Sequence, residues 1–357
     1  MQAKERAMKP HRAVTLLILT LCAASGCQPA ATPPAAAQRQ LPSWMTDEEE
    51  SGGGDASPFG VSPAKAQLAL QLKPGDRFPL RKVVQQQLTQ SSANGQPELS
   101  HSQLEVLFAI TVEEVNNGRT KLAVRYDRVK YQHDVAGDRV SFDSNLPAEN
   151  PPVSVWAYRD MVGDGFKFWI GADSQIAEVE GFTDFLKRCL RNVPEELKNS
   201  VMLGMEGGSG EDGIANFVDN SIGLLPIGAP RSPGDSWERS RFISRPIPMQ
   251  LQNSYTLQDL TEQEATIAIR GTIAAGSVGA TSADSAQVQV LGGATQGTCT
   301  IDRLTGLPKS SRVERQVDML VKLPQAEFRQ QKRVLTTIEA FPVSPGGQVI
   351  QVGFEQR

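Results

Sequence analysis

Strict alternation of apolar and polar residues is the pattern that most constrains the fold of this chain. From Leu104 to Val112 every even position is apolar, while most odd positions are polar or small. Successive side chains of a strand point to opposite faces of a sheet, so this period predicts a strand with one buried face. Asn117-Gly118 follows, a pair suited to the positive φ angles of a type I′ turn, and the alternation resumes from Leu122 to Tyr126. The pattern predicts a β-hairpin.

The same order of signals recurs in the second half of the chain. Pro74-Gly75-Asp76 precedes Phe78, and Pro233-Gly234-Asp235 precedes Trp237. In both places Pro presets the second position of a turn, and Gly supplies the positive φ of the third. Alternating segments follow each turn, and both series end in similar strand-turn-strand sequence. We therefore predict an internal duplication, with chance similarity between two antiparallel segments as the alternative.

Helical periodicity separates the two series. Apolar residues from Phe182 to Val193 recur at intervals of three and four, which places them on one stripe of a helix. Pro194 and the two glutamates after it suit the first turn of a second helix, and a third short helix is predicted from Ile214 to Ser221. The expected fold class is α+β, with predominantly antiparallel β-sheets in two related modules and a central helical insert.

The N-terminal region carries the features of an export signal. Basic residues in segment 9–12 are followed by apolar residues 13–24, and the small residues Ala24-Ser25-Gly26 then precede Cys27. Twelve apolar residues are too few for a transmembrane helix, so we expect the segment to be exported and cleaved. This order resembles the lipobox of bacterial lipoproteins, in which the cysteine is acylated. An ordinary cleavage site is the alternative.

A stretch with little apolar periodicity follows the leader. It contains an acidic run at 47–50 and three consecutive glycines at 52–54. Such a composition cannot bury a core, so we expect a disordered tether. The expected organisation is a signal peptide (1–26), a tether rich in Pro, Ala, Gly and acidic residues (27–66), a first β module (67–181), a helical insert (182–226), a second β module (227–342) and a C-terminal tail (343–357).

Two cysteines fall in the expected folded part. Cys189 lies on the apolar stripe of its helix, and Cys299 shares strand parity with Ile301, so both are predicted to be buried. Buried free cysteines that pack as small hydrophobes are our interpretation. A disulfide between them is the alternative, because export places the chain in an oxidising compartment.

The sequence lacks the recognised catalytic and metal-binding motifs. It has no Gly-x-Ser-x-Gly, His-Glu-x-x-His, Cys-x-x-Cys, Walker or EF-hand pattern. Asp76 and Asp235 are explained by bonds to neighbouring backbone amides in their turns, and His101 and His133 by surface positions. We expect no catalytic residue, no metal site and no cofactor. The net charge of −4, without a Lys/Arg-rich run, argues against a nucleic-acid partner.

Several of these features together resemble a known group of proteins. They are the leader, the tether, the two Pro-Gly-Asp turns with their following aromatic residues, and the late Ile301-Asp302-x-x-Thr305-Gly306 turn. In combination they resemble an uncharacterised family of predicted bacterial secreted lipoproteins, over about residues 68–342. The resemblance implies no catalytic residues. A more distant likeness of layout is to periplasmic lipoprotein-carrier proteins, whose curved sheet holds acyl chains.

The expected function follows from the predicted export signal and from the absence of catalytic and metal-binding motifs. We predict an exported lipoprotein that is anchored to a membrane through lipidated Cys27 and faces the periplasm or the cell exterior. It would act as a non-catalytic binding or scaffolding module for an unidentified envelope protein, polymer or apolar ligand. A carrier of a lipid or another small hydrophobe is one alternative, and a hydrolase of unrecognised type is another.

Overall fold

The computed structural model describes most of the chain from residue 65 to residue 341. The described residues are 65–92, 97–135, 137–146, 151–204, 218, 221–243, 247–276, 287–323 and 326–341. The strands are β1 Arg77–Ser92, β2 Glu98–Asn116, β3 Arg119–Val135, β4 Asp138–Asp143, β5 Gly165–Ile170, β6 Ile176–Glu180, β7 Ser236–Ile243, β8 Met249–Leu260, β9 Glu264–Ala275, β10 Gln287–Asp302, β11 Pro308–Leu323 and β12 Ala326–Ala340. The helices are the 3₁₀ turn η3 Val153–Val155, α2 Trp156–Met161, α3 Phe182–Cys189 and α4 Glu195–Gly204.

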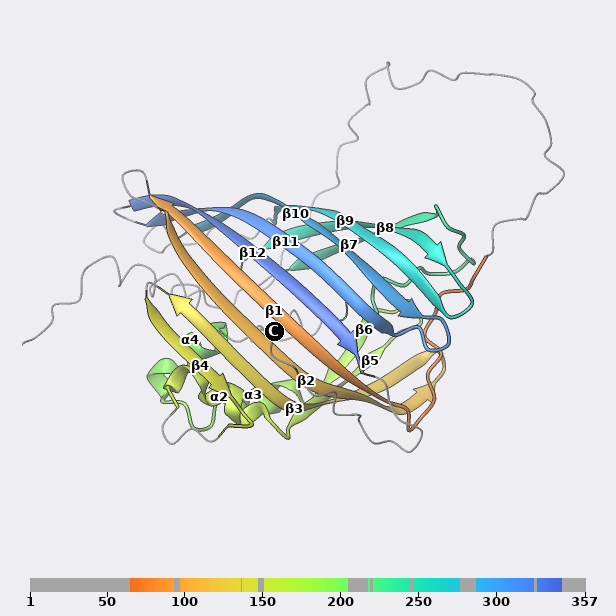
Figure 1. Cartoon of the computed structure of the whole chain (residues 1–357), viewed down its shortest axis with the longest axis horizontal. Coiled ribbons are helices and arrows are strands. Elements are labelled where there is room, and N and C mark those ends of the chain that lie inside the picture. Colours follow the sequence, from red (N-terminus) through yellow and green to blue (C-terminus); the bar gives the residue numbers. More distant parts are fainter. Residues whose placement is uncertain are drawn as a thin grey trace, which may run out of the picture.

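The strands form one twelve-stranded antiparallel sheet (Figure 1). Its order is β6-β5-β3-β2-β1-β12-β11-β10-β9-β8-β7, with β4 paired to β3 off this path. The chain passes strand by strand from β1 to the β6 edge. It then crosses to the β7 edge and returns to β12, beside β1.

The expected α+β class, with two sheet modules around a central helical insert, is wrong. Strands β1 and β12 pair continuously, from Leu80 opposite Ala340 to Ser92 opposite Phe328. An unpaired strand edge exposes backbone donors and acceptors, and this pairing satisfies them by merging the two series into one sheet. The described helices of the predicted insert, α3 and α4, are short and lie beside the β3 and β5 end of that sheet (Figure 1).

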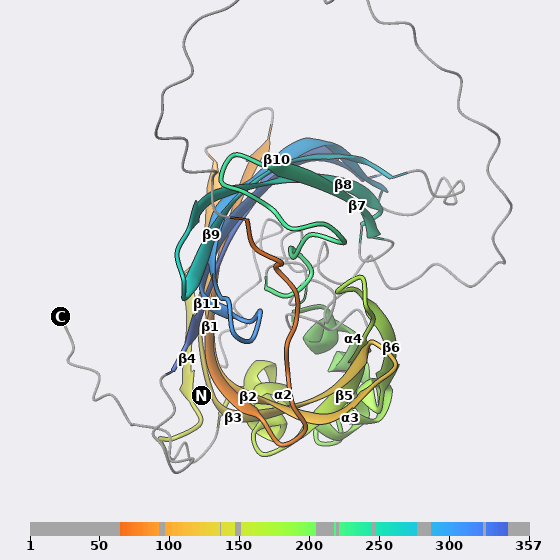
Figure 2. The ribbon, with the colours of Figure 1, turned by 90° about the vertical axis from the view of Figure 1, so that its right-hand side faces the viewer.

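The sheet is strongly curved, so the β6 and β7 edges come round toward each other (Figure 2). Arg239 on β7 links the two sides, because its Nη2 donates to the Asp173 carbonyl in the β5–β6 turn at 3.1 Å and to the Leu225 carbonyl. The inner face carries the core. Phe166 of β5 packs against the aromatic rings of Phe182 and Phe185, with centroid distances of 5.1 and 5.6 Å, so α3 covers the inner face here.

Other segments of the chain also occupy the concave side of the sheet. Residues 65–72 run across it (Figure 2). Ala66 exchanges two backbone hydrogen bonds of 2.9 Å with Arg231, and the Gln71 N–H donates to the Thr305 carbonyl at 3.0 Å. Leu68 and Leu225 are buried in the same cluster as the inner faces of β8 to β11. This part of the concave face is therefore filled by the protein itself.

The predicted turns have the expected conformations. Asn117 and Gly118 both have positive φ, 47° and 75°, between β2 and β3. In Pro74-Gly75-Asp76 the glycine N–H donates to the Val112 carbonyl at 2.8 Å, and the Val112 N–H donates to the aspartate carbonyl at 2.9 Å. Pro233-Gly234-Asp235 makes the same pair of bonds with Leu257, at 2.7 and 3.0 Å.

A third turn of this kind was not predicted. The Gly163 N–H donates to the Tyr126 carbonyl at 2.7 Å, and the Tyr126 N–H donates to the Asp164 carbonyl at 3.0 Å, just before β5. Val162 stands where the other two turns have proline, which hid the likeness in the sequence. The equivalent turns are in accord with a duplication, and superposition of the two strand series stays a prediction.

Candidate functional site

A groove of about 760 Å³ lies on the outer face of the sheet. It crosses six strands, in the order β11, β12, β1, β2, β3 and β4. We call it the outer groove. Its lining side chains on the outer face are Gln85, Gln87, His101, Gln103, Gln132, Asp134, Arg139, Ser141, Arg312, Glu314, Arg333 and Leu335.

One row of paired residues forms the floor of the outer groove. Directly opposite residues in antiparallel strands share a face, so the register places them side by side. The row, from β11 to β4, is Glu314, Leu335, Gln85, Gln103, Gln132 and Ser141. Neighbouring strands are about 4.8 Å apart, so the row extends for about 24 Å. The Gln85 amide Nε2 donates to Gln103 Oε1 at 3.1 Å.

Charged groups lie toward both ends of the row. Arg333 on β12 binds Glu314 with two parallel hydrogen bonds, Nε to Oε1 at 2.7 Å and Nη2 to Oε2 at 2.8 Å. The hydrogen bonds from Arg333 lower the pKa of the Glu314 carboxyl, so this group is ionised at neutral pH. Arg139 Nε donates to Asp134 Oδ2 at 2.7 Å near the β4 end. Both lining carboxylates are thus engaged by guanidinium groups.

The two histidines of the described chain lie on different faces of the sheet. His101 is exposed in the outer groove, where it pairs with Asp134. His133 is the neighbour of Asp134 on β3, so its side chain points to the inner face. His133 Nδ1 is 3.2 Å from the Tyr131 hydroxyl, and burial lowers the pKa of its imidazole. Within the described residues no group of three or more His, Cys, Asp or Glu side chains could hold a metal ion.

The aspartates of the two Pro-Gly-Asp turns bind backbone groups. Asp76 Oδ2 accepts from the Lys73 N–H at 2.9 Å, and Asp235 Oδ2 accepts from the Ser232 N–H at 2.8 Å. In the third turn, Asp164 Oδ1 accepts from the Gly165 N–H at 2.7 Å, and the carboxylate also binds Arg188 of α3, at 2.6 and 2.8 Å. That hydrogen-bonded pair lowers the pKa of the Asp164 carboxyl. These carboxylates hold turns and a helix in place.

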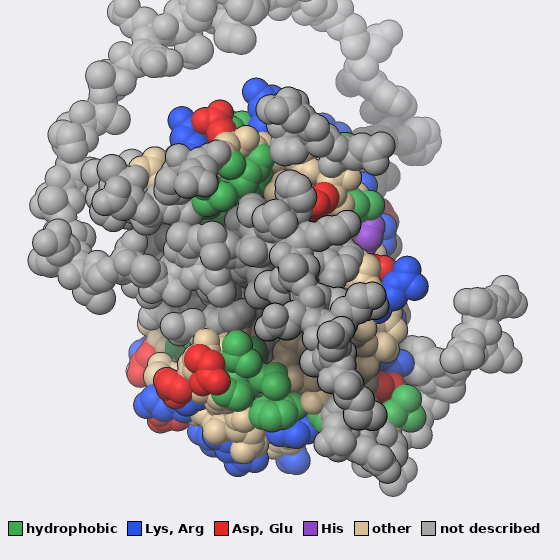
Figure 3. Space-filling view, turned by 90° about the vertical axis from the view of Figure 1, so that its left-hand side faces the viewer, with side chains coloured by type: hydrophobic (Ala, Val, Ile, Leu, Met, Phe, Trp, Pro, Cys, Tyr) green, Lys and Arg blue, Asp and Glu red, His purple; other side chains and the backbone are tan. Residues whose placement is uncertain are grey.

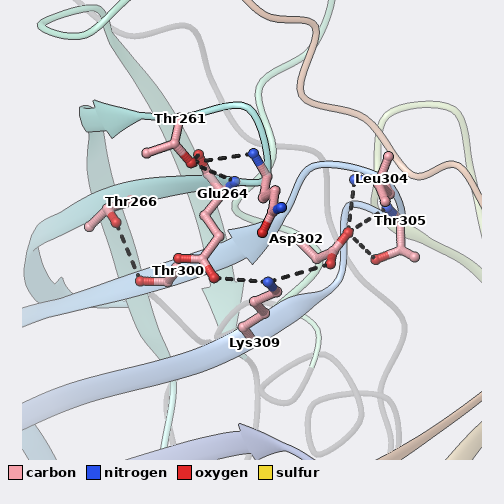
Figure 4. A network of polar contacts seen from close by, with 9 residues as sticks. Thr261, Glu264, Thr266, Thr300, Asp302, Leu304, Thr305 and Lys309 are labelled. Atoms are coloured by element: carbon pink, nitrogen blue, oxygen red, sulfur yellow. Dashed lines mark hydrogen bonds and ion pairs between the residues drawn. The ribbon is translucent and has the colours of Figure 1, made fainter. Parts of the chain in front are cut away.

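The Asp302 turn is a closed network of polar contacts (Figure 4). Asp302 Oδ1 accepts from the N–H groups of Leu304 and Thr305, at 2.8 and 3.1 Å. Lys309 Nζ lies 2.8 Å from Glu264 Oε1 and 3.8 Å from Asp302 Oδ2. Each charged group here has a partner within the turn and the strands next to it, so the network stabilises this end of β9, β10 and β11.

The three predicted cysteine sites have two outcomes. Cys27 lies outside the described residues. Cys189 and Cys299 are both free and buried, and they belong to two separate core clusters. Burial raises the pKa of each thiol to about 12, which keeps both protonated at neutral pH. Neither is a candidate nucleophile.

The outer groove was not predicted from the sequence. The available signal was the run Gln85-Gln86-Gln87 in β1, whose first and third residues have outward side chains that line the groove. A view of one end of the molecule shows basic and acidic side chains intermixed around apolar ones (Figure 3). In the described chain no helix is both long and apolar enough to cross a membrane.

The chain matches a known protein family. A family described as being of unknown function, DUF6263, matches residues 117–308, which is more than half of the chain. The chain belongs to the DUF6263 family. An uncharacterised family was predicted, and this is confirmed. The predicted leader (1–26) and tether (27–66) lie outside the matched residues, and they and the lipoprotein assignment stay predictions. No curated protein matches this DUF6263 chain.

Some solved structures are weakly similar to this DUF6263 chain. A lipovitellin structure, described by its lipid–protein interactions, has 10% identity and a TM-score of 0.39 over 79% of this chain and 27% of lipovitellin. An outer membrane channel from Pseudomonas putida F1 has 10% identity and a TM-score of 0.18, over 80% of this chain and 100% of the channel. This chain thus spans about a quarter of lipovitellin. TM-scores this low do not establish a shared fold.

Proposed function

We propose that this chain is a non-catalytic binding module, tethered to a membrane through lipidated Cys27, that binds a hydroxyl-rich polysaccharide in the outer groove. The observation that carries the proposal is the row of side-chain amides along the groove floor, from Gln85 through Gln103 to Gln132. The tether would keep this outer face accessible to a polymer of the cell envelope.

The chemistry of the floor favours a polar ligand. A glutamine amide both donates and accepts hydrogen bonds, as a sugar hydroxyl does, so the two groups can pair in either direction. An apolar ligand would remove these amides from water without giving them partners, at a cost of about 1–3 kcal/mol each on the scale of protein mutational data. Among the described residues, no Phe, Tyr or Trp ring lines the groove, so binding would depend mainly on hydrogen bonds and charge.

The shape favours a linear chain laid across the strands. Backbone groups under the floor are already paired with neighbouring strands, so an extended peptide could not add a strand here as it can at a sheet edge. A polysaccharide requires only side-chain contacts. A row about 24 Å long, at the spacing of six strands, would contact several sugar units.

The alternative functions have less support. A lipid carrier requires a free apolar cavity, whereas residues 65–72 and Leu225 fill part of the concave side. A retaining or inverting glycosidase requires one carboxyl that is protonated as a general acid. In the outer groove, Glu314 and Asp134 are bound to arginines, and the pKa of the Glu314 carboxyl is lowered.

Removing two floor amides tests the binding proposal. We expect the double variant Gln85→Leu, Gln103→Leu to bind a soluble oligosaccharide about tenfold more weakly, because each lost hydrogen bond contributes about 0.5–1.5 kcal/mol. Binding is measured by calorimetry on the mature protein in detergent, with a galacturonate hexamer and with maltohexaose. Gln289→Leu, on an exposed position of β10 outside the groove, is the matched control. Unchanged affinity in the double variant, or no binding by the wild type, would contradict the proposal.

Replacing Cys27 with Ser tests the tether. We expect the variant to lose its acyl anchor and move from the membrane fraction to the soluble fraction, since a single polar atom replaces the lipidated thiol. Fractionation and immunoblotting of cells that express either form make the measurement. Cys22→Ser, in the expected leader, is the control. A Cys27→Ser protein that remains in the membrane fraction would contradict lipidation at this residue.

A further inference from the structure

The two ends of the outer groove differ in their charge balance. At the β4 end, the ion pair between Arg139 and Asp134 is neutral overall. At the β11 end, Arg312 and Arg333 accompany a single lining carboxylate, Glu314. The lining therefore has an excess positive charge at the β11 end.

Arg312 carries that excess charge, because Glu314 is paired with Arg333. Residues 312 and 314 are two apart on β11 and share the outer face, about 7 Å apart along the strand. Arg333 binds both carboxylate oxygens of Glu314. Arg312 also lowers the pKa of the Glu314 carboxyl, by the electrostatic attraction of its charge and without a hydrogen bond. Among the described residues, Arg312 has neither an ion pair nor a side-chain hydrogen bond, and it is exposed in the groove lining.

We infer, building on the proposed function, that the outer groove selects an acidic polysaccharide, with a carboxylate of the sugar bound by the Arg312 guanidinium while its hydroxyls pair with the glutamine row. A guanidinium presents its N–H donors as a planar fork that matches a carboxylate. The unengaged Arg312 can offer this fork without first breaking an existing ion pair. The charges of Arg333 and Arg139 are already balanced by Glu314 and Asp134.

A ligand bound along the groove strengthens this contact. A charge pair at a fully exposed surface contributes little, because water and salt screen it. A ligand that lies in the groove displaces water from one side of Arg312, and a hydrogen bond to a charged group is then stronger than one between neutral groups. The neutral sugars would keep only the amide contacts.

Replacement of Arg312 separates the acidic preference from general sugar binding. We expect the wild-type mature protein to bind a galacturonate hexamer more tightly than maltohexaose. Arg312→Gln should weaken galacturonate binding about tenfold and weaken maltohexaose binding much less, because only the acidic sugar pairs with the positive charge. Arg270→Gln, at an exposed position of β9 outside the groove, is the control. Raising the salt concentration should weaken only the galacturonate complex.

A second variant protects the test against a folding defect. Arg312→Lys keeps the charge and loses the planar fork, so its galacturonate affinity should fall between those of the wild type and Arg312→Gln. Equal binding of the two hexamers by the wild type would overturn the acidic selectivity and leave the proposed function standing. The same holds if Arg312→Gln and Arg270→Gln behave alike. Failure of the wild type to bind either hexamer would overturn both.

Discussion

Replacing Gly165 with Ala should destabilise the protein by about 3 kcal/mol or more, at the upper end of overpacking effects. Gly165 begins β5 and pairs with Arg125 of β3. A Cβ atom at Gly165 would lie 1.8 Å from the carbonyl oxygen of Val124 and 2.8 Å from the carbonyl carbon of the same residue. These neighbours are backbone atoms of a central strand, so the clash can be relieved only by separating β5 from β3.

The measurement is guanidinium unfolding of the mature protein, followed by circular dichroism. Gly163→Ala, in the turn just before β5, is the matched control. Gly163 has a φ of 83° and no atom within 4 Å of the Cβ position, so it isolates the conformational cost. That cost is about 1–2 kcal/mol for a left-handed residue. Equal stability losses in the two variants would show that the close contact with Val124 is not decisive.

Replacing Gly306 with Ala should release residues 65–72 from the inner face and destabilise the protein by about 2–4 kcal/mol. Gly306 has a φ of 76°, which disfavours any residue with a Cβ. The added Cβ would also lie 2.4 Å from the Ala69 carbonyl oxygen and 3.0 Å from the Leu70 Cα. Because the segment is held here, by the hydrogen bond from Gln71 to Thr305, the clash is expected to displace it.

Limited proteolysis with trypsin reports this release directly. Cleavage after Lys73, which follows the docked segment, should be markedly faster in Gly306→Ala than in the wild type. Gly137→Ala is the control, because Gly137 has a φ of 84° in the β3–β4 turn and no atom within 4 Å of its Cβ position. A Gly306→Ala protein with the wild-type digestion pattern would mean that the segment tolerates the added methyl group.

Local features of this fold could be predicted because local physics determines them. Alternation from Leu104 to Val112 predicted β2, and Asn117-Gly118 predicted the turn after it. The apolar stripe that begins at Phe182 predicted α3, and α4 begins at Glu195, in the predicted first turn. In each case the signal and the structure lie within the same few residues, where backbone preference and side-chain period act.

The candidate site could not be predicted in the same way. Periodicity shows that a strand has a buried face and an outer face, and it does not show which strand lies beside it. Gln85 and Glu314 share a groove only because β1 pairs with β12 and β12 with β11. The excess charge of Arg312 depends likewise on Arg333 crossing from β12 to engage Glu314. No short stretch of sequence contains these relations.

The sequence by itself determined the strands with clear alternation, the Asn-Gly turn and the two Pro-Gly-Asp turns, the buried positions of both cysteines and the absence of familiar catalytic motifs. The tertiary structure alone decided that two series of strands form one curved sheet, and that residues 65–72 occupy its concave side. The physical reason is the range of the interactions. Turn preference and side-chain alternation act over a few residues, whereas strand pairing satisfies backbone hydrogen bonds between segments from opposite ends of the folded chain.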